Sequence, residues 1–261
     1  MYIPIIPTPG PLDAALYRKR IGAAGHADSP RDLLDHLHQR HLLSIPFETL
    51  DHADARTPSL DIPTIHEKIV RGRRGGDSFE LGLLFGWLLG ELGYDFEFRA
   101  GAVDDAGVPA LLLAVELDGA PLLVDVGFTT GLVTPVALRG GAATTTRDAE
   151  IRLIDGEKES LVLERIQPEA RTRVIRIAPS PLDEAGILRL HREFTSSIAG
   201  REAEAAILTD AGFARLDGTE LALPHRAVRT IAENEIPYYL DNLFEIEMDS
   251  DTWGRQGDLA R

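Results

Sequence analysis

The stretch Arg73-Arg74-Gly75-Gly76-Asp77-Ser78-Phe79-Glu80-Leu81 decides how the rest of the sequence is interpreted. From Phe79 to Leu92, apolar residues recur at helical spacing. The two glycines therefore predict a turn that delivers Asp77 and Ser78 to the first turn of a buried helix. Unpaired backbone N–H groups and the positive end of the helix dipole favour negative charge there. A thiol at that place would have a lowered pKa and act as a nucleophile, but the chain has no cysteine and Ser78 occupies it.

Length, composition and charge exclude several classes of protein. The 261 residues are 44% hydrophobic, which is enough for a full core. A net charge of −15 argues against binding to nucleic acid or to an anionic membrane surface. No apolar run reaches the roughly 18 residues of a membrane span, and the N-terminus lacks the basic residues of a signal peptide. We therefore expect a cytoplasmic protein with neither nucleic acid nor a membrane as partner.

The first third of the chain predicts helices at about 12–22, 30–45 and 62–70, ahead of the helix that begins at Phe79. Ser29 is the predicted N-cap of the second helix, and Pro30 fits its first turn. Histidines 36, 38 and 41 lie in this helix beside Asp35. A spacing of three residues drifts around a helix, so we interpret these histidines as surface or core residues and expect no metal site.

From Phe96 the periodicity changes to that of β-strands. Strands are predicted at 96–103, 111–117, 122–126, 151–153, 160–164 and 172–177. Turn signals lie at Asp104-Asp105-Ala106-Gly107, Asp118-Gly119 and Asp155-Gly156. Antiparallel strands in succession indicate a small barrel or a curled sheet.

The last third mixes helices and strands. A helix is predicted at 181–198, with Ser180 as N-cap and Pro181 in its first position. Strands follow at 205–208, 213–216 and 220–223, then a short segment 228–231 and a helix at 235–244. The polar end, Asp249 to Arg261, is expected to fray. The whole pattern predicts an α+β fold.

Three motifs make the chain resemble the arylamine N-acetyltransferase family. They run from His41 to Asp51, from Lys68 to Leu81, and from Leu111 to the Val124-Asp-Val-Gly-Phe128 sequence. The resemblance implies a helical N-terminal domain, an antiparallel β-barrel middle domain and an α/β C-terminal lid. The corresponding boundaries are 1–93 for the helical domain, 94–178 for the barrel, and 179–261 for a connecting helix with the lid.

The resemblance also implies a catalytic mechanism, and this chain has only some of the residues that the mechanism requires. The family uses a cysteine that takes an acetyl group from acetyl-CoA, a histidine that activates it, and an aspartate that orients the histidine. The cysteine's place falls on Ser78, the preceding tyrosine's on Asp77, the histidine's on Ala110 and the aspartate's on Asp125. Glycines that approach the CoA phosphates in the family fall on Thr129-Thr130.

Ser78 is a poor replacement for the thiol. A hydroxyl depends on an adjacent base more than a thiol does, and Ala110 supplies none. Losing the nucleophile or base of a triad lowers turnover by a factor on the order of 10⁶, about 8 kcal/mol. The helix dipole stabilises a negative charge at the helix start by only about 0.3–1 kcal/mol. A histidine from elsewhere in the fold could supply the base, and the candidates are His66, His191 and His225.

The two acids each admit two interpretations. Asp77 and Asp125 could form a general acid–base pair. Alternatively, Asp77 caps the helix while Asp125 bonds to Ser78 or to backbone. The candidate catalytic residues are thus Ser78, Asp125 and Asp77. By resemblance, the candidate substrate-binding residues are Phe47, Ala110, Phe128, Thr129 and Thr130. Arg73, Arg74 and Glu80 are interpreted as a structural ion-pair group.

Three functions remain open. The first is an enzyme of specialised metabolism, for example antibiotic biosynthesis, that transfers an acyl group by direct attack or cyclises a bound small molecule. The second is an inactive binding or scaffold protein that keeps the cleft, and the third is acetyl transfer through Ser78. The resemblance implies acetyl-CoA or another acyl thioester as donor, a small-molecule substrate, and an acyl carrier protein as a partner of the first function.

Overall fold

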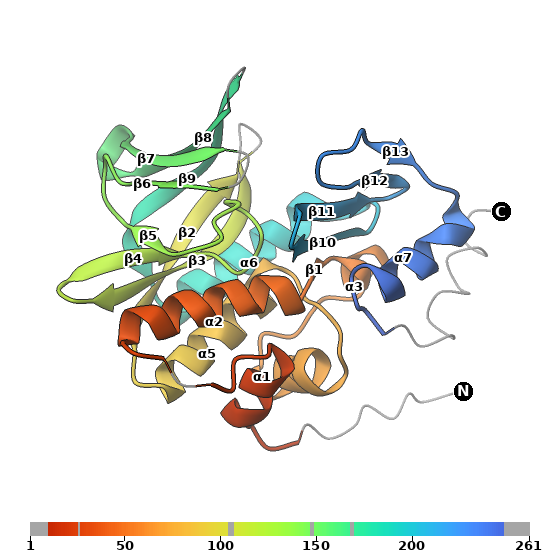
Figure 1. Cartoon of the computed structure of the whole chain (residues 1–261), viewed down its shortest axis with the longest axis horizontal. Coiled ribbons are helices and arrows are strands. Elements are labelled where there is room, and N and C mark those ends of the chain that lie inside the picture. The colour runs from red at the N-terminus through yellow and green to blue at the C-terminus, as the bar shows by residue number, and fades with distance from the viewer. Residues whose placement is uncertain (1–9, 26, 104–106, 147–148, 168–169, 248–261) are drawn as a thin grey trace.

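The computed structural model describes residues 10–25, 27–103, 107–146, 149–167 and 170–247 (Figure 1). The first third holds the helices α1 (Ala14–Arg20), α2 (Pro30–Ser44), α3 (Leu50–Ala53), α4 (Ile62–His66) and α5 (Ser78–Glu91), with a π-helical turn (Glu67–Arg71) directly after α4. Ser29 caps α2 by accepting a hydrogen bond from the Asp32 backbone N–H, and Pro30 occupies its first turn, as predicted. The four predicted helices are confirmed, whereas the short helix α3 was not predicted.

Helix α5 is the centre of this part of the molecule. Most of its side chains are buried, including Phe79, Leu81, Phe85 and Leu88. It packs against α1 and α4 and against strands β2 (Asp95–Val103) and β3 (Val108–Leu117). A helix that is apolar on all sides needs such cover, so the run that begins at Phe79 organises both the helical part and the barrel.

The middle of the chain forms an antiparallel barrel. Among the described residues, its eight strands have the order β5-β4-β3-β2-β9-β8-β7-β6. Besides β2 and β3, they are β4 (Ala120–Val124), β5 (Val136–Ala137), β6 (Ala143–Thr145), β7 (Glu150–Asp155), β8 (Leu161–Gln167) and β9 (Ala170–Leu182). Side chains such as Leu112, Ile151 and Leu163 fill its interior. The predicted α+β fold with an antiparallel barrel is confirmed (Figure 1).

Two of the predicted turns can be compared with the structure. Asp118 and Gly119 both have positive φ, 53° and 77°, as a two-residue hairpin requires, and they join β3 to β4 as predicted. Asp155-Gly156 lies in the connection of the predicted hairpin, since β7 and β8 pair antiparallel, and the connection continues through a 3₁₀ turn (Glu157–Glu159) before β8. Of the third predicted turn, residues 104–106 lie outside the described residues, as does the predicted frayed end from Asp249 to Arg261.

A second sheet lies to the right of the barrel in Figure 1 and has the order β1-β10-β11-β12-β13. Its strands are β1 (Phe47–Glu48), β10 (Glu204–Thr209), β11 (Gly212–Asp217), β12 (Glu220–Ala222) and β13 (Arg229–Thr230), followed by a 3₁₀ turn (Glu233–Glu235) and helix α7 (Ile236–Asn242). Strand β1 was not predicted. Its Phe47 pairs with Ala206 of β10, so a segment from the first third becomes the edge of the C-terminal sheet.

The predicted start of the helix at 181 is wrong. Strand β9 continues to Leu182, and helix α6 (Glu184–Ile198) begins only after Asp183, whose side chain accepts from the Gly186 N–H. Pro181 lies opposite Arg99 of β2, while β8 pairs with β9 only up to Ile177. The proline therefore lies where β9 has a partner on one side alone, a place that tolerates a missing N–H.

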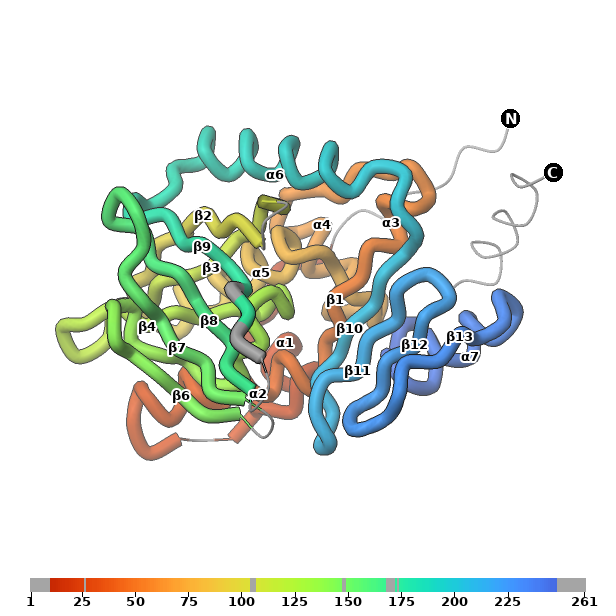
Figure 2. The backbone as a smooth tube through the Cα atoms, turned by 90° about the horizontal axis from the view of Figure 1, so that it is seen from above, coloured from red at the N-terminus to blue at the C-terminus, as the bar shows by residue number. Residues whose placement is uncertain are grey.

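Helix α6 connects the parts of the molecule. In Figure 2 it runs along one side, from the end of β9 to the start of β10. It packs on β3 and β9 and carries Phe194 and Ile198 into a cluster with Phe79 and Leu111. The predicted domain boundaries at 93/94 and 178/179 remain predictions. Within the described ranges, no helix has the length and apolar character that crossing a membrane requires.

Candidate functional site

The glycine turn before α5 is fixed by backbone contact with β1. The Glu48 N–H donates to the Gly76 carbonyl (2.9 Å), and the Gly76 N–H donates to the Pro46 carbonyl (3.3 Å). A Cβ atom on Gly75 would lie 2.3 Å from the Pro46 carbonyl oxygen. Only glycine permits this approach, and the loop thereby holds Asp77 and Ser78 at a fixed position.

Asp77 is the N-cap of α5, as one of its two interpretations predicted. Its Oδ1 accepts from the backbone N–H groups of Phe79 and Glu80, both at 2.9 Å, while Glu80 accepts from the Asp77 N–H at 3.1 Å. This reciprocal capping box satisfies the free donors at the helix start. Ser78 is the first helical residue and only 3% exposed, and its Oγ has no hydrogen-bond partner in the described part of the chain.

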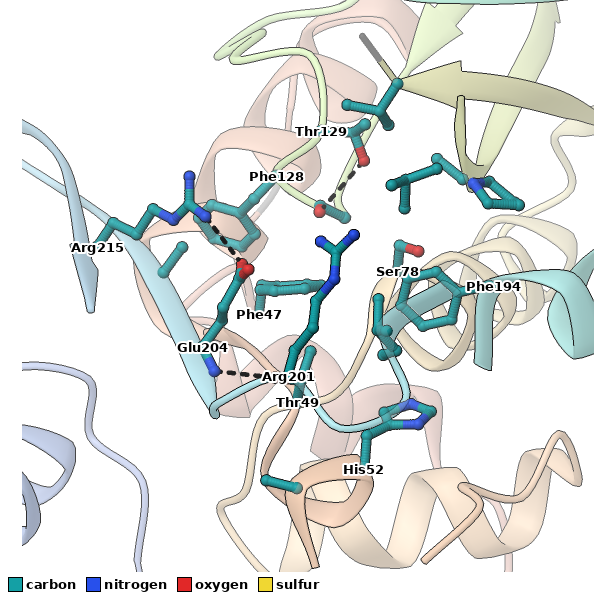
Figure 3. Close-up of a pocket in the computed structure, with 18 of the residues that line it drawn as sticks. Phe47, Thr49, His52, Ser78, Phe128, Thr129, Phe194, Arg201, Glu204 and Arg215 are labelled. Atoms are coloured by element: carbon teal, nitrogen blue, oxygen red, sulfur yellow. Dashed lines mark hydrogen bonds and ion pairs between the residues drawn. The ribbon is translucent and has the colours of Figure 1, made fainter. Parts of the chain in front are cut away.

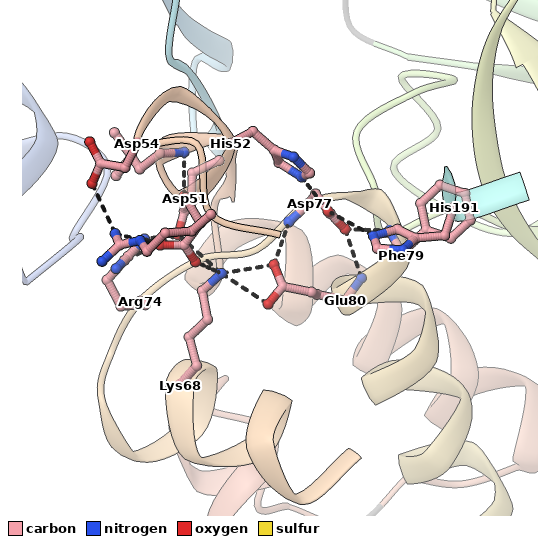
Figure 4. Close-up of polar contacts among 12 residues, drawn as sticks. Asp51, His52, Asp54, Lys68, Arg74, Asp77, Phe79, Glu80 and His191 are labelled. Atoms are coloured by element: carbon pink, nitrogen blue, oxygen red, sulfur yellow. Dashed lines mark hydrogen bonds and ion pairs between the residues drawn. The ribbon is translucent and has the colours of Figure 1, made fainter. Parts of the chain in front are cut away.

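The second carboxylate oxygen of Asp77 lies between two histidines (Figure 4). His52 of α3 places Nε2 2.8 Å from Oδ2, and His191 of α6 places Nε2 3.9 Å from the same oxygen. Burial would raise the pKa of Asp77, but the hydrogen bonds from His52 and the helix N–H groups outweigh it and lower that pKa. Burial lowers the pKa of His191. Asp77 is therefore an anion, and His191 favours its neutral form.

A buried ion network supports the turn from its other side (Figure 4). Lys68 of the π-helical turn lies 2.8 Å from Glu80 and 2.7 Å from Asp51, and Arg74 lies 2.7 Å from Glu48. Burial alone would raise the pKa of Asp51, but the neighbouring Lys68 and Arg74 lower it to about 2. The predicted structural role of Arg74 and Glu80 agrees with these contacts.

Arg73 does not join this network. Its side chain pairs with Glu247 at 3.0 Å and lies 3.7 Å from Glu245. It therefore ties the turn to the end of the described chain, and the predicted group of Arg73, Arg74 and Glu80 is divided between two places.

Both carboxylate oxygens of Asp125, just after β4, accept hydrogen bonds from the loop that follows it. Its Oδ1 accepts from the Gly127 N–H (2.9 Å), and its Oδ2 accepts from the N–H (2.6 Å) and hydroxyl (2.7 Å) of Thr130. Of its two interpretations, bonding to backbone is confirmed, and Ser78 is not among its partners. Both donors of Thr130 are used in this way, which leaves neither for a ligand phosphate.

None of the three histidines proposed as a base forms a hydrogen bond with Ser78. Nε2 of His66 lies 3.2 Å from the Asp13 carbonyl oxygen, and its ring packs edge-on against Trp87. His225 is exposed in the C-terminal sheet region, and His191 faces Asp77. Of the α2 histidines, His38 donates to the Asp125 carbonyl (2.8 Å) and His41 bonds to Tyr17 (2.7 Å), as core residues.

His52 is the residue that the sequence did not predict. It lies in the four-residue helix α3, which has no periodicity to detect. The only signal was indirect: a carboxylate at position 77, in a buried helix start, requires a partner for its second oxygen.

A cavity of about 270 Å³ lies over Ser78 (Figure 3). Five predicted residues line it, namely Phe47, Ser78, Ala110, Phe128 and Thr129. Asp77, Asp125 and Thr130 are buried and are not among its lining residues. Residues that line it without having been predicted include His52, Phe194, Arg201, Glu204 and Arg215.

The cavity wall is closely built around Ser78. A Cβ atom on Gly127 would lie 2.8 Å from the Ser78 Cβ, so the loop after Asp125 packs directly on the serine. Phe128 follows with a φ of 60°, an uncommon backbone angle for a non-glycine residue, and its ring packs edge-on against Phe213. The loop therefore supplies both the hydrogen bonds of Asp125 and an aromatic wall.

Charged side chains stand at the other side of the cavity. Arg215 pairs with Glu204 at 3.2 Å. Arg201 points into the cavity near Ser78 and Phe47 (Figure 3), and its guanidinium forms no hydrogen bond or ion pair with any residue the structure describes. In the same residues no group of three His, Cys, Asp or Glu side chains could hold a metal ion. The cavity thus offers aromatic surface, the Arg201 guanidinium without an ion pair in the described residues, and the His52 ring.

Comparison with known proteins places these features in a family context. A family model described as N-acetyltransferase matches residues 32–253. An arylamine N-acetyltransferase of Escherichia coli (strain K12) is 38% identical over 145 residues, which are 53% of this chain and 52% of that protein. The proansamycin X synthase of Amycolatopsis mediterranei is 32% identical over 156 residues, 56% of this chain and 60% of that protein. The chain thus matches between half and three-fifths of the length of these relatives.

Agreement with solved structures extends further along the chain. The structure of Mycobacterium marinum arylamine N-acetyltransferase in complex with CoA is similar, with a TM-score of 0.79 and 28% sequence identity. That alignment covers 90% of this chain and 93% of the other. The fold therefore has well-defined counterparts among solved structures.

Proposed function

Because the chain belongs to the arylamine N-acetyltransferase family, we propose that it transfers an acyl group from a thioester to an amine or hydroxyl by direct attack. No acyl group is carried on the protein in this reaction. The thioester, the attacking group and the leaving thiol all lie in the cavity over Ser78, whose volume of about 270 Å³ suits a small aromatic or acyl group.

The observation that carries this proposal is the isolation of Ser78. Its Oγ has no hydrogen-bond partner in the described chain, and Ala110 lines the cavity where the family resemblance places the histidine. Asp125, which would orient such a histidine, already accepts three hydrogen bonds from Gly127 and Thr130. A serine without a base is a weak nucleophile, so the acceptor itself is the group that attacks.

The cavity lining indicates the class of ligand. Phe47, Phe128 and Phe194 offer surface to an aromatic ring or an acyl chain, and aromatic side chains of this kind dominate small-molecule pockets. Arg201 adds a cation whose guanidinium forms no hydrogen bond or ion pair with the described residues, although it interacts electrostatically with Glu204. We therefore propose a ligand that combines an aromatic or acyl portion with a negatively charged group.

The relatives suggest the donor and the setting. An arylamine N-acetyltransferase of similar structure binds CoA, which supports a thioester donor. The similarity to a proansamycin X synthase supports a role in specialised metabolism such as antibiotic biosynthesis, where an acyl carrier protein would present the acyl chain. Amide or ester formation and ring closure are the same acyl transfer with an external or an internal acceptor.

The proposal is tested with small thioesters that mimic both sources of acyl group. Purified protein is incubated with acetyl, benzoyl and longer acyl N-acetylcysteamine thioesters and with the matching acyl-CoA compounds. An aromatic amine, a hydrazine and an alcohol serve as acceptors. We expect an amide or ester product and no acyl adduct in the intact mass of the protein.

The alternatives give different results. An acyl adduct that disappears in Ser78→Ala would show transfer through the serine. Absence of product from every donor and acceptor, together with ligand binding in calorimetry, would favour an inactive binding protein. A preference for CoA over N-acetylcysteamine thioesters would identify a CoA donor, and the reverse would favour a carrier-bound one.

A further inference from the structure

His52 and Asp77 form a pair that the family motif does not contain. The resemblance assigns a tyrosine to position 77, whereas this chain has an aspartate that is fully buried and bonded to His52 at 2.8 Å. His52 also lines the cavity that contains Ser78. One imidazole therefore contacts both a buried carboxylate and the space where a ligand would bind.

The hydrogen bonds fix how the His52 ring is protonated. Asp77 is held by the capping box, so its Oδ2 faces His52 as an acceptor. Nε2 must then carry the proton that it donates, which leaves Nδ1 with a lone pair. Nδ1 has no hydrogen-bond partner within the described ranges. A carboxylate that fixes one imidazole nitrogen as a donor makes the other a base.

The surroundings hold this ring in place beside the Asp77 carboxylate. The His52 side chain is only 5% exposed. Its ring packs edge-on against that of Phe194, with the ring centroids 5.5 Å apart. Among the described residues, two further titratable groups lie at Asp77. They are His191 of α6, 3.9 Å from the same oxygen, and Glu80, which accepts a hydrogen bond from the Asp77 N–H, and burial favours the neutral form of both. Asp77 therefore remains free to stabilise a positive charge on His52 when that ring takes up a proton.

We propose that His52, oriented by Asp77, is the general base and general acid of acyl transfer in this cavity. This inference rests on the proposed function. Nδ1 of His52 removes the proton of the amine or hydroxyl. At the same time, the lone pair on the amine nitrogen or hydroxyl oxygen attacks the carbonyl carbon of the thioester. The new C–N or C–O bond forms, the C–S bond breaks, and the thiolate receives the proton from His52. The products are an amide or ester and a free thiol, and the protein is unchanged.

Kinetics of matched variants test this assignment. With the N-acetylcysteamine thioester and amine that the wild-type protein accepts, His52→Gln should lower kcat by about 10²–10⁴-fold, the usual contribution of a positioned base. The fall in kcat/KM toward low pH, which reports protonation of the base, should also disappear. His36→Gln alters an exposed histidine of α2 and is the control for loss of an imidazole. Asp77→Asn keeps the imidazole but removes the carboxylate that orients it, so it should lower kcat while the fall in kcat/KM toward low pH remains.

A measurement on the wild-type protein guards against misfolding of the variants. The ¹⁵N shifts of the His52 ring should show a protonated Nε2 and an unprotonated Nδ1 at neutral pH. The opposite tautomer would overturn the inference. Unchanged kcat and pH profile in His52→Gln would also overturn it, while leaving the proposed acyl transfer intact. No turnover by the wild-type protein would overturn both.

Discussion

At the scale of single residues, Asp77 and Ser78 show which features of the site a sequence motif can predict and which contacts it cannot. The helix start, the cap at Asp77 and the position of Ser78 follow from local sequence, because a glycine turn followed by helical periodicity fixes them. The partner of the Asp77 carboxylate does not follow. His52 approaches it from a separate helix, 25 residues earlier in the chain, and no periodicity encodes that contact.

Restoring the missing side chains should restore covalent chemistry. Ser78→Cys places a thiol at a helix start, where its pKa falls, and Ala110→His adds an imidazole across the cavity. We expect the double variant to form an acyl-cysteine from acetyl-CoA about 10²–10⁴-fold faster than Ser78→Cys alone, because it gains a base. Intact-mass kinetics measure the adduct, with Ala110→His alone as the control without a thiol. Equal rates in the single and double variants would mean that a side chain at position 110 does not reach position 78.

At the scale of elements, the sequence predicted the helices better than their ends and contacts. Apolar residues at helical spacing mark α2, which buries one face, and α5, which buries most of its side chains. The start of α6 was misplaced because Ser180-Pro181 has the composition of a helix start while β9 still pairs with β2 at Pro181. Local propensity was overridden there by a tertiary hydrogen-bonding partner.

The π-helical turn and α5 are joined by Lys68, and removing it should destabilise the protein. Burial raises the pKa of Glu80 to about 8 even though Lys68 lowers it, so Lys68→Met favours the protonated Glu80 carboxyl further and also removes the cation that lies 2.7 Å from Asp51. The change should cost about 3 kcal/mol of unfolding free energy, as loss of one partner of a buried ion pair does. Urea unfolding measures this. Lys19→Met, an exposed lysine of α1, is the matched control, and equal stability of the two variants would contradict the assignment.

Helix α2 should make the fold sensitive to mild acid. Burial lowers the pKa of His38 and of His41, so the folded protein binds these protons more weakly than the unfolded chain. The contribution of these histidines to the free energy of unfolding is therefore fully present above the unfolded histidine pKa of about 6.5. It falls as the pH drops below that value, by about 1.4 kcal/mol per pH unit for each proton. Urea unfolding at pH 7.5, 6.5 and 5.5 measures the slope. His41→Gln should reduce it and exposed His36→Gln should not, whereas a flat profile in the wild-type protein would contradict the prediction.

At the scale of the whole molecule, the cavity depends on contacts that no local pattern specifies. Its walls come from the helical part (His52 and Ser78), from the barrel (Ala110) and from the region after α6 (Arg201). Strand β1 completes it, because pairing with β10 brings Phe47 beside the C-terminal sheet. The family resemblance predicted Phe47 and Ala110 as binding residues. It did not indicate Arg201, which lines the cavity from the segment after α6.

Arg201 should therefore give the cavity a preference for negatively charged ligands. Benzoate and benzamide have nearly the same shape and differ in charge, so their difference in affinity isolates the contribution of the cation. We expect benzoate to bind more tightly, and Arg201→Gln to remove about 1 kcal/mol of that preference, roughly fivefold in Kd, because the guanidinium is solvent-exposed and screened. Calorimetric titration measures both ligands. Arg139→Gln changes the net charge equally at an exposed position outside the cavity. If that variant lost the preference to the same extent, the effect would come from overall charge, and the placement of Arg201 at the ligand would be wrong.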